Sequence, residues 1–496
     1  MNKKVISYGH SRRQFIRYGA LTAGGAVLAG PYLLRGQNLN SRLNIAQIGL
    51  GVKGMSDAQW CATENLVALC DVNSTPMDNL KQYVPAARAY KDFRELFEKE
   101  KSLDAVDIAV PDHNHAVIAA MAIKLGKHVY CQKPLTHDVS EARLLRDLAR
   151  QYKVATQMGN QGSAADGLRR GVELVQAGLI GPVRQAFVWT NRPIWPQGLE
   201  RPAGSDPVPA NLDWDLWLGT APARPFKEKW PEAQLAEQTQ LLHFSPQHYH
   251  AQFLQFSPNV YQPFNWRGWY DFGTSVMGDM GCHTLNWPFR ALKLGYPTEV
   301  EASSSGMMAE MYPNSSRIRF EFPAREGLPP VTVRWLDGGN TPPAEVTADI
   351  TVMFGGISSS GCVMIGEKGM MFSPDVGDDE FRVFVKLKDD KEWAAAPRHE
   401  GAKAIAQTMP RNAFDNREPA DFRHHKEWFA ACKSGRHETA CSNFEIGAYL
   451  TEIILLGCVA LRAGRKLEWD GPGMKAKNAP EAAQFLKREY RAGWNI

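Results

Sequence analysis

Beyond its first 36 residues, the sequence has no cluster of basic residues. The 496 residues contain 57 lysines and arginines against 53 aspartates and glutamates, but six of the basic residues lie in the first 36 positions, which contain no acid. The remaining 51 basic and 53 acidic residues leave a net charge of −2. A nearly neutral body offers no electrostatic basis for binding nucleic acid or an anionic membrane, so we expect neither as a partner.

The eight cysteines also lack a pattern typical of a metal site. No spacing among them, or around His248 and His250, has the form of a zinc site, and we predict no metal. Cys61, Cys70 and Cys131 fall in apolar stretches, where cysteine behaves as a small hydrophobic residue. We therefore expect no disulfide framework.

The N-terminus has no hydrophobic run long enough for a stable membrane span. The sequence "SRRQFI" over residues 11–16 precedes 17 uncharged residues that include four glycines and a proline. This pattern resembles a twin-arginine export signal, and the alternative is a membrane anchor. Because the run is short and weakly apolar, we expect residues 1–36 to direct export to the periplasm or beyond, with no integral span in the mature chain. Twin-arginine export carries folded proteins, which suits a protein that takes up a cofactor in the cytoplasm.

What the sequence does contain is a dinucleotide-binding pattern. An apolar strand predicted over residues 43–48 leads into three glycines with the spacing G-x-G-x-x-G, namely Gly49, Gly51 and Gly54. A second strand, "NLVALCD", ends on Asp71, twenty residues after Gly51. The glycines permit a tight turn against a pyrophosphate, and the acid binds the ribose hydroxyls. Asp71 would repel a 2′-phosphate and no arginine follows it, which favours NAD over NADP. The alternative is a chance glycine-rich turn.

Two further strands end in polar turns. The strand predicted over residues 104–110 is followed by "PDHNH" and a helix that closes on Gly126, and "HVYCQ" leads to Lys133. The alternatives are that Asp112 only caps the helix, that His113 and His115 are ordinary turn residues, and that Lys133 is a solvated rim residue. In a parallel doubly wound sheet, however, all strand carboxyl ends share the ligand-binding edge. We therefore include Asp112, His115 and Gln132 among the candidate cofactor-binding residues.

Together, the glycine turn, Asp71, "PDHNH" and "QKP" resemble the glucose-fructose oxidoreductase and inositol dehydrogenase (Gfo/Idh/MocA) family from about Leu43 to the C-terminus. In that family the strand ends in Glu-Lys-Pro, and its lysine lies beside the nicotinamide and binds the substrate hydroxyl. Here Gln132 replaces the glutamate and removes a negative charge next to Lys133.

The family's Asp-x-x-x-His pair corresponds to Asp279 and His283. Four residues apart on a helix, the carboxylate is expected to orient or charge-stabilise the imidazole, although such pairs also occur on solvated helices. The resemblance implies that Lys133 and His283 are catalytic, with Asp279 supporting them. We take His283 as the base, because its ordinary pKa lies near neutrality.

Residues 189–270 depart from a minimal family member. They contain seven of the fourteen tryptophans: Trp189, Trp195, Trp214, Trp217, Trp230, Trp266 and Trp269. These side chains either anchor an irregular excursion or form a wall that binds sugar. Residues 298–390 predict strands, including "VTVRW", "ITVMF" and "RVFVKL", and residues 445–461 predict a core helix.

The predicted fold is α/β, with an N-terminal Rossmann doubly wound parallel sheet over residues 43–165. An α+β domain with a large, mainly antiparallel open sheet follows over residues 166–496, and the resemblance implies a homo-oligomer. The predicted function is NAD-dependent oxidation of a secondary hydroxyl on a sugar or sugar derivative. The alternatives are a glycosidase that retains NAD and acts by transient oxidation and elimination, and a sugar-binding protein without catalysis.

Overall fold

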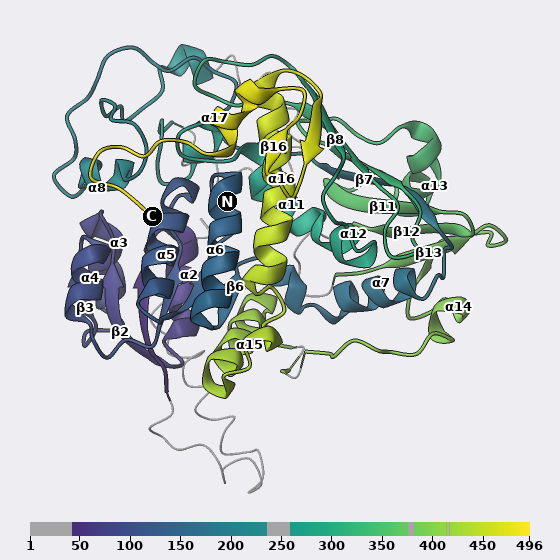
Figure 1. The fold of residues 1–496 in the computed structure, drawn as a ribbon, viewed down its shortest axis with the longest axis horizontal. Coiled ribbons are helices and arrows are strands. Elements are labelled where there is room, and N and C mark those ends of the chain that lie inside the picture. Colours follow the sequence, from purple (N-terminus) through teal and green to yellow (C-terminus); the bar gives the residue numbers. More distant parts are fainter. Residues whose placement is uncertain (1–41, 236–257, 375–380, 413, 416) are drawn as a thin grey trace, which may run out of the picture.

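The computed structural model describes most of the chain, and Figure 1 shows its two sheets on either side of a layer of helices. The described residues are 42–235, 258–374, 381–412, 414–415 and 417–496. The predicted export signal, the pair His248 and His250, and part of the tryptophan-rich excursion lie outside these ranges.

The first sheet has six parallel strands in the order β3-β2-β1-β4-β5-β6. Their bounds are β1 Asn44–Ile48, β2 Asn65–Cys70, β3 Arg88–Tyr90, β4 Ala105–Ile108, β5 His128–Cys131 and β6 Thr156–Met158. The direction of winding reverses between β1 and β4, which is the point where open α/β sheets bind ligands. The predicted Rossmann sheet is confirmed.

Helices connect these strands, and local capping explains several of their starts. The bounds are α2 Val52–Cys61, α3 Ser74–Lys81, α4 Phe93–Lys99, η2 Asp112–Asn114, α5 His115–Lys124 and α6 Val139–Tyr152. The side chains of Asn73 and Asp92 accept hydrogen bonds from backbone amides at the starts of α3 and α4. Asp138 and Glu141 form a capping box at the start of α6. These polar residues satisfy the free amides that every helix N-terminus exposes.

The second sheet has ten strands in the order β14-β13-β12-β11-β7-β10-β9-β8-β15-β16. Among the described strands of this second sheet, only β7 and β10 pair in parallel. The bounds are β7 Val183–Thr190, β8 Glu299–Ser304, β9 Ser316–Phe322, β10 Val331–Leu336, β11 Ser360–Gly366, β12 Gly369–Ser373, β13 Phe384–Leu387, β14 Ala394–Ala395, β15 Leu467–Asp470 and β16 Lys475–Ala476. The predicted large, mainly antiparallel sheet is confirmed, including the strands at "VTVRW" and "RVFVKL".

The strand predicted at "ITVMF" is wrong, because these residues end helix α13, Ala344–Phe354. Pro343 precedes the helix in an extended conformation, and Gly355 ends it with a φ of +71°. Val346, Thr347 and Ile350 are buried on one face, whereas Val352 is 85% exposed. The β-branched residues favour a strand locally, but the proline start, the glycine stop and the three- to four-residue burial period favour a helix.

The remaining helices fill the space between and around the sheets. Their bounds are η3 Gln161–Ala164, α7 Asp166–Gln176, α8 Trp214–Leu218, η4 Asn265–Gly268, α11 Ser275–Thr284, α12 Asn286–Ala291, α14 Glu400–Lys403, α15 Ala420–Ser434, η5 His437–Thr439, α16 Phe444–Ala463, η6 Pro480–Ala482 and α17 Ala483–Leu486. In Figure 1, α16 runs between the two sheets, where it contacts α6, α11 and β8. Within the described residues, α16 alone is long and apolar enough to cross a membrane, but 83% of its most apolar window is buried. The predicted core helix is confirmed.

The tryptophan-rich excursion has a small core of its own. Trp214, Trp217, Trp230, Trp266 and Trp269 pack in one buried cluster, while Trp189 and Trp195 are buried elsewhere. All seven side chains are thus covered by protein, which favours the anchoring interpretation over a sugar-binding wall. The excursion also docks on the first sheet through a bridge between Asn73 and Leu212. It therefore lies next to the turn that follows Asp71.

Candidate active site

The three glycines of the first turn differ in the space around them. Gly49 has a φ of +86°, and a Cβ there would lie 2.4 Å from the carbonyl oxygen of Ala109. A Cβ on Gly54 would lie 2.0 Å from the carbonyl oxygen of Gly49, so the helix and the turn are in close contact. A Cβ on Gly51 would meet nothing within 4 Å, so the chain leaves that position open. Gly51 precedes α2, where a pyrophosphate would lie against the helix N-terminus.

Asp71 lies at the end of β2, facing the glycine turn. Its Oδ2 accepts a hydrogen bond from the Leu50 amide at 2.6 Å, and its Oδ1 accepts one from the Asn73 amide at 2.8 Å. Burial raises the pKa of Asp71 to about 6. Each carboxylate oxygen retains a second acceptor site, which the ribose hydroxyls of a dinucleotide would fill. The residues present thus fit NAD.

The "PDHNH" turn is bound to its neighbours by side chains. Thr274 donates a hydrogen bond to Asp112 Oδ2 at 2.6 Å, and burial raises the pKa of Asp112. Asp112 therefore does not cap α5, whose N-cap is Asn114. The ring nitrogens of His115 lie 2.8 Å from the carbonyl oxygens of Val110 and Pro134. His115 thereby ties this turn to the one that holds Lys133, and no described contact assigns it to a cofactor.

Lys133 contacts the second domain directly. Its Nζ donates to Asp279 Oδ1 at 2.7 Å and to the Asp279 carbonyl oxygen at 2.9 Å. Arg267 Nε donates to the same Oδ1 at 3.0 Å. Burial alone would raise the pKa of Asp279, but Lys133 and Arg267 hold it below its usual range. The carboxylate therefore stays ionised and fixes two cations at the carboxyl edge of the first sheet.

His283 makes no hydrogen bond to Asp279, so the carboxylate does not orient the ring directly, although its charge favours the protonated imidazole. Although both lie on α11, no hydrogen bond joins them in the described structure, and the buried Nδ1 of His283 has no protein partner there. Burial and the charge of Lys133 lower the pKa of His283 to about 3. The ordinary pKa of histidine, on which the choice of His283 as base relied, is therefore not the pKa of this residue in the folded chain. The imidazole is neutral at pH 7 and can accept a hydrogen bond.

Asn160, which follows β6, also contributes to this region. Its Nδ2 donates to the carbonyl oxygen of Cys282 at 3.2 Å, whereas its buried Oδ1 has no partner among the described residues. Asp112 Oδ1 is likewise buried without a partner in the described part of the chain. Buried polar atoms are almost always hydrogen-bonded, so atoms left free around Lys133 point to ligand hydroxyls or amides as partners.

Gln132 points away from Lys133, into a buried network. Its Nε2 donates to Asp57 Oδ2 at 2.8 Å, and Lys53 Nζ binds Asp57 Oδ1 at 2.5 Å. Lys133 keeps a carboxylate partner in Asp279, so glutamine at position 132 does not leave its ammonium without a counter-charge. The assignment of Gln132 to the cofactor stays a prediction.

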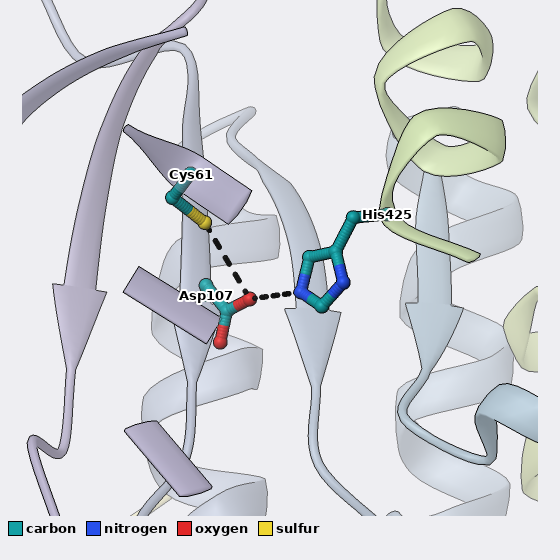
Figure 2. Close-up of side chains that lie close together, drawn as sticks. All are labelled: Cys61, Asp107 and His425. Atoms are coloured by element: carbon teal, nitrogen blue, oxygen red, sulfur yellow. Dashed lines mark hydrogen bonds and ion pairs between the residues drawn. The ribbon is translucent and has the colours of Figure 1, made fainter. Parts of the chain in front are cut away.

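Beside this network, Cys61, Asp107 and His425 lie close enough together to hold a metal ion. Figure 2 shows His425 reaching from α15 to Asp107, with Cys61 on the other side of the carboxylate. His425 Nε2 faces Asp107 Oδ2 at 3.1 Å, and Nδ1 faces the Asp421 carbonyl oxygen at 2.7 Å. Although burial alone would lower it, Asp107 and Asp57 raise the pKa of His425. Because both ring nitrogens face acceptors and a ligand nitrogen must be unprotonated, the cluster is better explained as a clamp between α15 and the sheet.

Arg267, Asn160 and Thr274 were missed by sequence reasoning. Arg267 lies in an irregular segment with no period, and Thr274 precedes α11 without a motif of its own. The only available signal for Asn160 was its position after a strand of the Rossmann sheet, at the edge where the other strand-end residues gather.

Comparison with known proteins agrees with this geometry. Residues 43–160 match the family model GFO_IDH_MocA, described as "Oxidoreductase family, NAD-binding Rossmann fold". These residues form an NAD-binding domain of the Gfo/Idh/MocA family. The cofactor prediction and the recognised resemblance are confirmed for this domain.

Curated relatives match mainly this NAD-binding domain. Myo-inositol 2-dehydrogenase of Thermotoga maritima is 27% identical over 142 residues, which are 28% of this chain and 42% of that protein. Rhizopine catabolism protein MocA of Rhizobium meliloti is 26% identical over 156 residues, 31% of this chain and 49% of that protein. The matched part of the chain thus spans less than half the length of these curated relatives.

Solved structures extend the likeness in fold to the second domain. Aldose-aldose oxidoreductase from Caulobacter crescentus, complexed with glycerol, superposes with a TM-score of 0.54 and 15% identity, covering 86% of this chain and 100% of that one. An inositol dehydrogenase homolog from Azotobacter vinelandii, complexed with NADH and myo-inositol, gives the same TM-score and identity and covers 86% and 98%. This chain therefore shares its two-domain architecture with both of these structures.

Proposed function

We propose that this protein transfers a hydride between a secondary hydroxyl of a sugar or sugar derivative and NAD. The observation that carries the proposal is the contact of 2.7 Å between Lys133 Nζ and Asp279 Oδ1, at the carboxyl edge of an NAD-binding sheet. His283, one helical turn from Asp279, offers an acceptor without a partner among the described residues. Support also comes from the names of two relatives, myo-inositol 2-dehydrogenase and levoglucosan dehydrogenase.

The side chains divide the work of alcohol oxidation between them. Lys133 uses two of its three N–H groups on Asp279 and has one left to donate to the reacting oxygen, where negative charge develops. Asp279 keeps the ammonium in place. When bound, NAD supplies the nicotinamide ring that accepts the hydride.

The hydroxyl proton moves to the imidazole of His283, which is neutral and whose Nδ1 has no partner in the described structure. An imidazole with a pKa of about 3 is a weak base, so the transfer depends on Lys133 and Arg267 making the bound hydroxyl more acidic. The weak basicity of His283 is therefore offset by the two cations, which lower the pKa of the substrate hydroxyl.

A screen of the purified full-length protein against sugars and glycosides tests the proposal. Net NADH formation that depends on Lys133 would support the dehydrogenase. Released sugar without net NADH would instead indicate the NAD-retaining glycosidase. Binding of sugar with neither product would indicate a binding protein, and the combination of Lys133, Asp279 and His283 argues against that outcome.

We also propose that the protein is exported and assembles as a homo-oligomer. The twin-arginine pattern in residues 11–16 supports export. The exposed apolar side chains of Val352, Met353 and Phe354 on α13 support an interface on the second domain. Fractionation of cells and the solution mass of the mature protein test these two points.

A further inference from the structure

We propose that the sugar substrate carries a carboxylate, as uronic and aldonic acids do, and that Arg267 binds it. This inference rests on the proposed oxidation of a sugar and names the class of sugar. It comes from the charges, the fixed guanidinium and the unpartnered acceptors that the described residues place around Asp279.

Two cations meet on one oxygen of Asp279. Its Oδ1 binds both Lys133 and Arg267, at 2.7 and 3.0 Å. Arg192 lies near enough to lower the pKa of both Asp279 and His283. Asp112 is a second buried carboxyl group near Arg267, and burial raises its pKa. Two cations therefore share one carboxylate oxygen, and an anionic ligand would complement the second positive charge.

The guanidinium of Arg267 is fixed in place by hydrogen bonds and aromatic rings. Its Nε binds Asp279 and its Nη1 donates to the Phe264 carbonyl oxygen at 3.0 Å. The guanidinium carbon lies 4.1 Å from the ring centre of Phe264 and 4.3 Å from that of Trp266. These contacts fix the plane of the group, while Nη2 has no protein partner in the described part of the chain. A fixed, charged group with a free donor nitrogen suits a carboxylate better than a neutral hydroxyl.

Two other buried atoms without a partner among the described residues indicate which groups the ligand carries besides its anionic group. The buried His283 Nδ1 can accept from a hydroxyl, and so can Asn160 Oδ1. A ligand that satisfies both of these acceptors and the guanidinium therefore carries hydroxyl donors together with an anion. A polyhydroxylated carboxylic acid has this composition, whereas a neutral sugar offers the arginine only hydroxyl oxygens, which are weaker acceptors than a carboxylate.

The test compares matched acid and neutral sugars on the full-length protein saturated with NAD. Calorimetry would measure binding of D-glucuronate against D-glucose, D-galacturonate against D-galactose, and D-gluconate against D-glucitol. We expect at least one acid to bind about tenfold or more tightly than its neutral partner, the scale of one charge-assisted contact. That preference should weaken as salt is raised. Neutral members that bind as tightly as the acids, or acids that do not bind at all, would overturn the inference.

Variants assign the preference to the arginine. Arg267→Gln should remove it, and Arg267→Lys should keep part of it, because the charge remains but the fork is lost. Arg319→Gln is the matched control, since Arg319 pairs with Glu301 on the exposed surface of the ten-stranded sheet. Thermal unfolding and NAD affinity show whether each variant folds. If Arg267→Gln does not fold, Arg192→Gln should still reduce the preference, and an unchanged preference in a folded variant would count against the proposal.

NADH measured in the same samples separates this inference from the proposed function. Acid-selective binding without NADH or released sugar from any compound would leave the inference standing and reject the oxidation. NADH formed from neutral sugars, with no preference for acids, would support the oxidation and reject the carboxylate inference.

Discussion

Gln132 donates a hydrogen bond to Asp57 across 75 positions of sequence, at 2.8 Å in the buried interior of the Rossmann domain. The glutamine thus complements a carboxylate on α2, which also binds Lys53. A glutamate at position 132 would place a second carboxylate against Asp57. The identity of residue 132 is therefore coupled to the charge at position 57.

Gln132→Glu should lower the free energy of unfolding by about 2–4 kcal/mol at pH 7, since it puts like charges together where water is excluded. Because burial raises the pKa of Asp57, that residue protonates before most carboxylates as pH falls, and the loss should be smaller at pH 5. Urea unfolding at the two pH values measures both effects. Adding Asp57→Asn should restore most of the stability, and a strictly additive double variant would contradict the pairing.

NAD affinity should depend on the ionisation of Asp71, whose pKa is raised to about 6 by burial. Above pH 6 the ionised carboxylate can accept from the ribose hydroxyls, and below it the protonated form loses acceptor capacity. Affinity should therefore weaken about tenfold between pH 7 and pH 5, following the ionised fraction. Calorimetry on Asp71→Asn should show weaker binding with little change over this interval. The same variant should gain relative affinity for NADP, and an unaltered protein with equal affinity for both cofactors would refute the argument.

Gly51 and Gly54 should separate cofactor binding from folding. A side chain at Gly51 meets nothing within 4 Å, so Gly51→Val should fold normally but lose NAD affinity by about a hundredfold or more, because its side chain enters the pyrophosphate position. A side chain at Gly54 meets a backbone oxygen at 2.0 Å, so Gly54→Val should lower the melting temperature. Melting curves and NAD titrations of both variants test the distinction. Equal destabilisation of the two would contradict it.

Export should depend on the arginine pair in residues 11–16. A chain with Lys in place of both Arg12 and Arg13 should remain in the cytoplasm, because the export receptor reads guanidinium groups rather than charge alone. Replacing Arg17 by Lys provides the control. Unchanged export of the double variant would point to a different route.

The sequence reveals the parts of this protein that depend on local pattern. The glycine turn, Asp71 and the position of Lys133 follow from strand, turn and helix signals within short windows, and the Rossmann order follows from their alternation. The strand predicted at "ITVMF" is wrong because the prediction used only the local preference of β-branched residues for strands. Pro343 and Gly355 instead bound a helix there.

Long-range pairing is what the sequence does not show. Arg267 and Lys133 meet on Asp279 only after the two domains pack, and no spacing predicts that Asp279 binds these cations instead of His283. The low pKa of His283 has the same origin, because it arises from burial and from a lysine 150 positions away. Such effects arise from contacts that form only in the folded protein, and no sequence motif encodes them.

Turnover of Lys133→Met is the most direct test of the central claim, that the ammonium of Lys133 acts on the reacting oxygen. Methionine keeps the length of the side chain and removes its charge. On a sugar that the screen identifies, turnover should fall by roughly two to four orders of magnitude, the scale of one positioned acid, base or electrostatic donor. NAD affinity and melting temperature should stay close to those of the unaltered protein. Turnover near the original rate in this folded, NAD-binding variant would contradict the role assigned to Lys133.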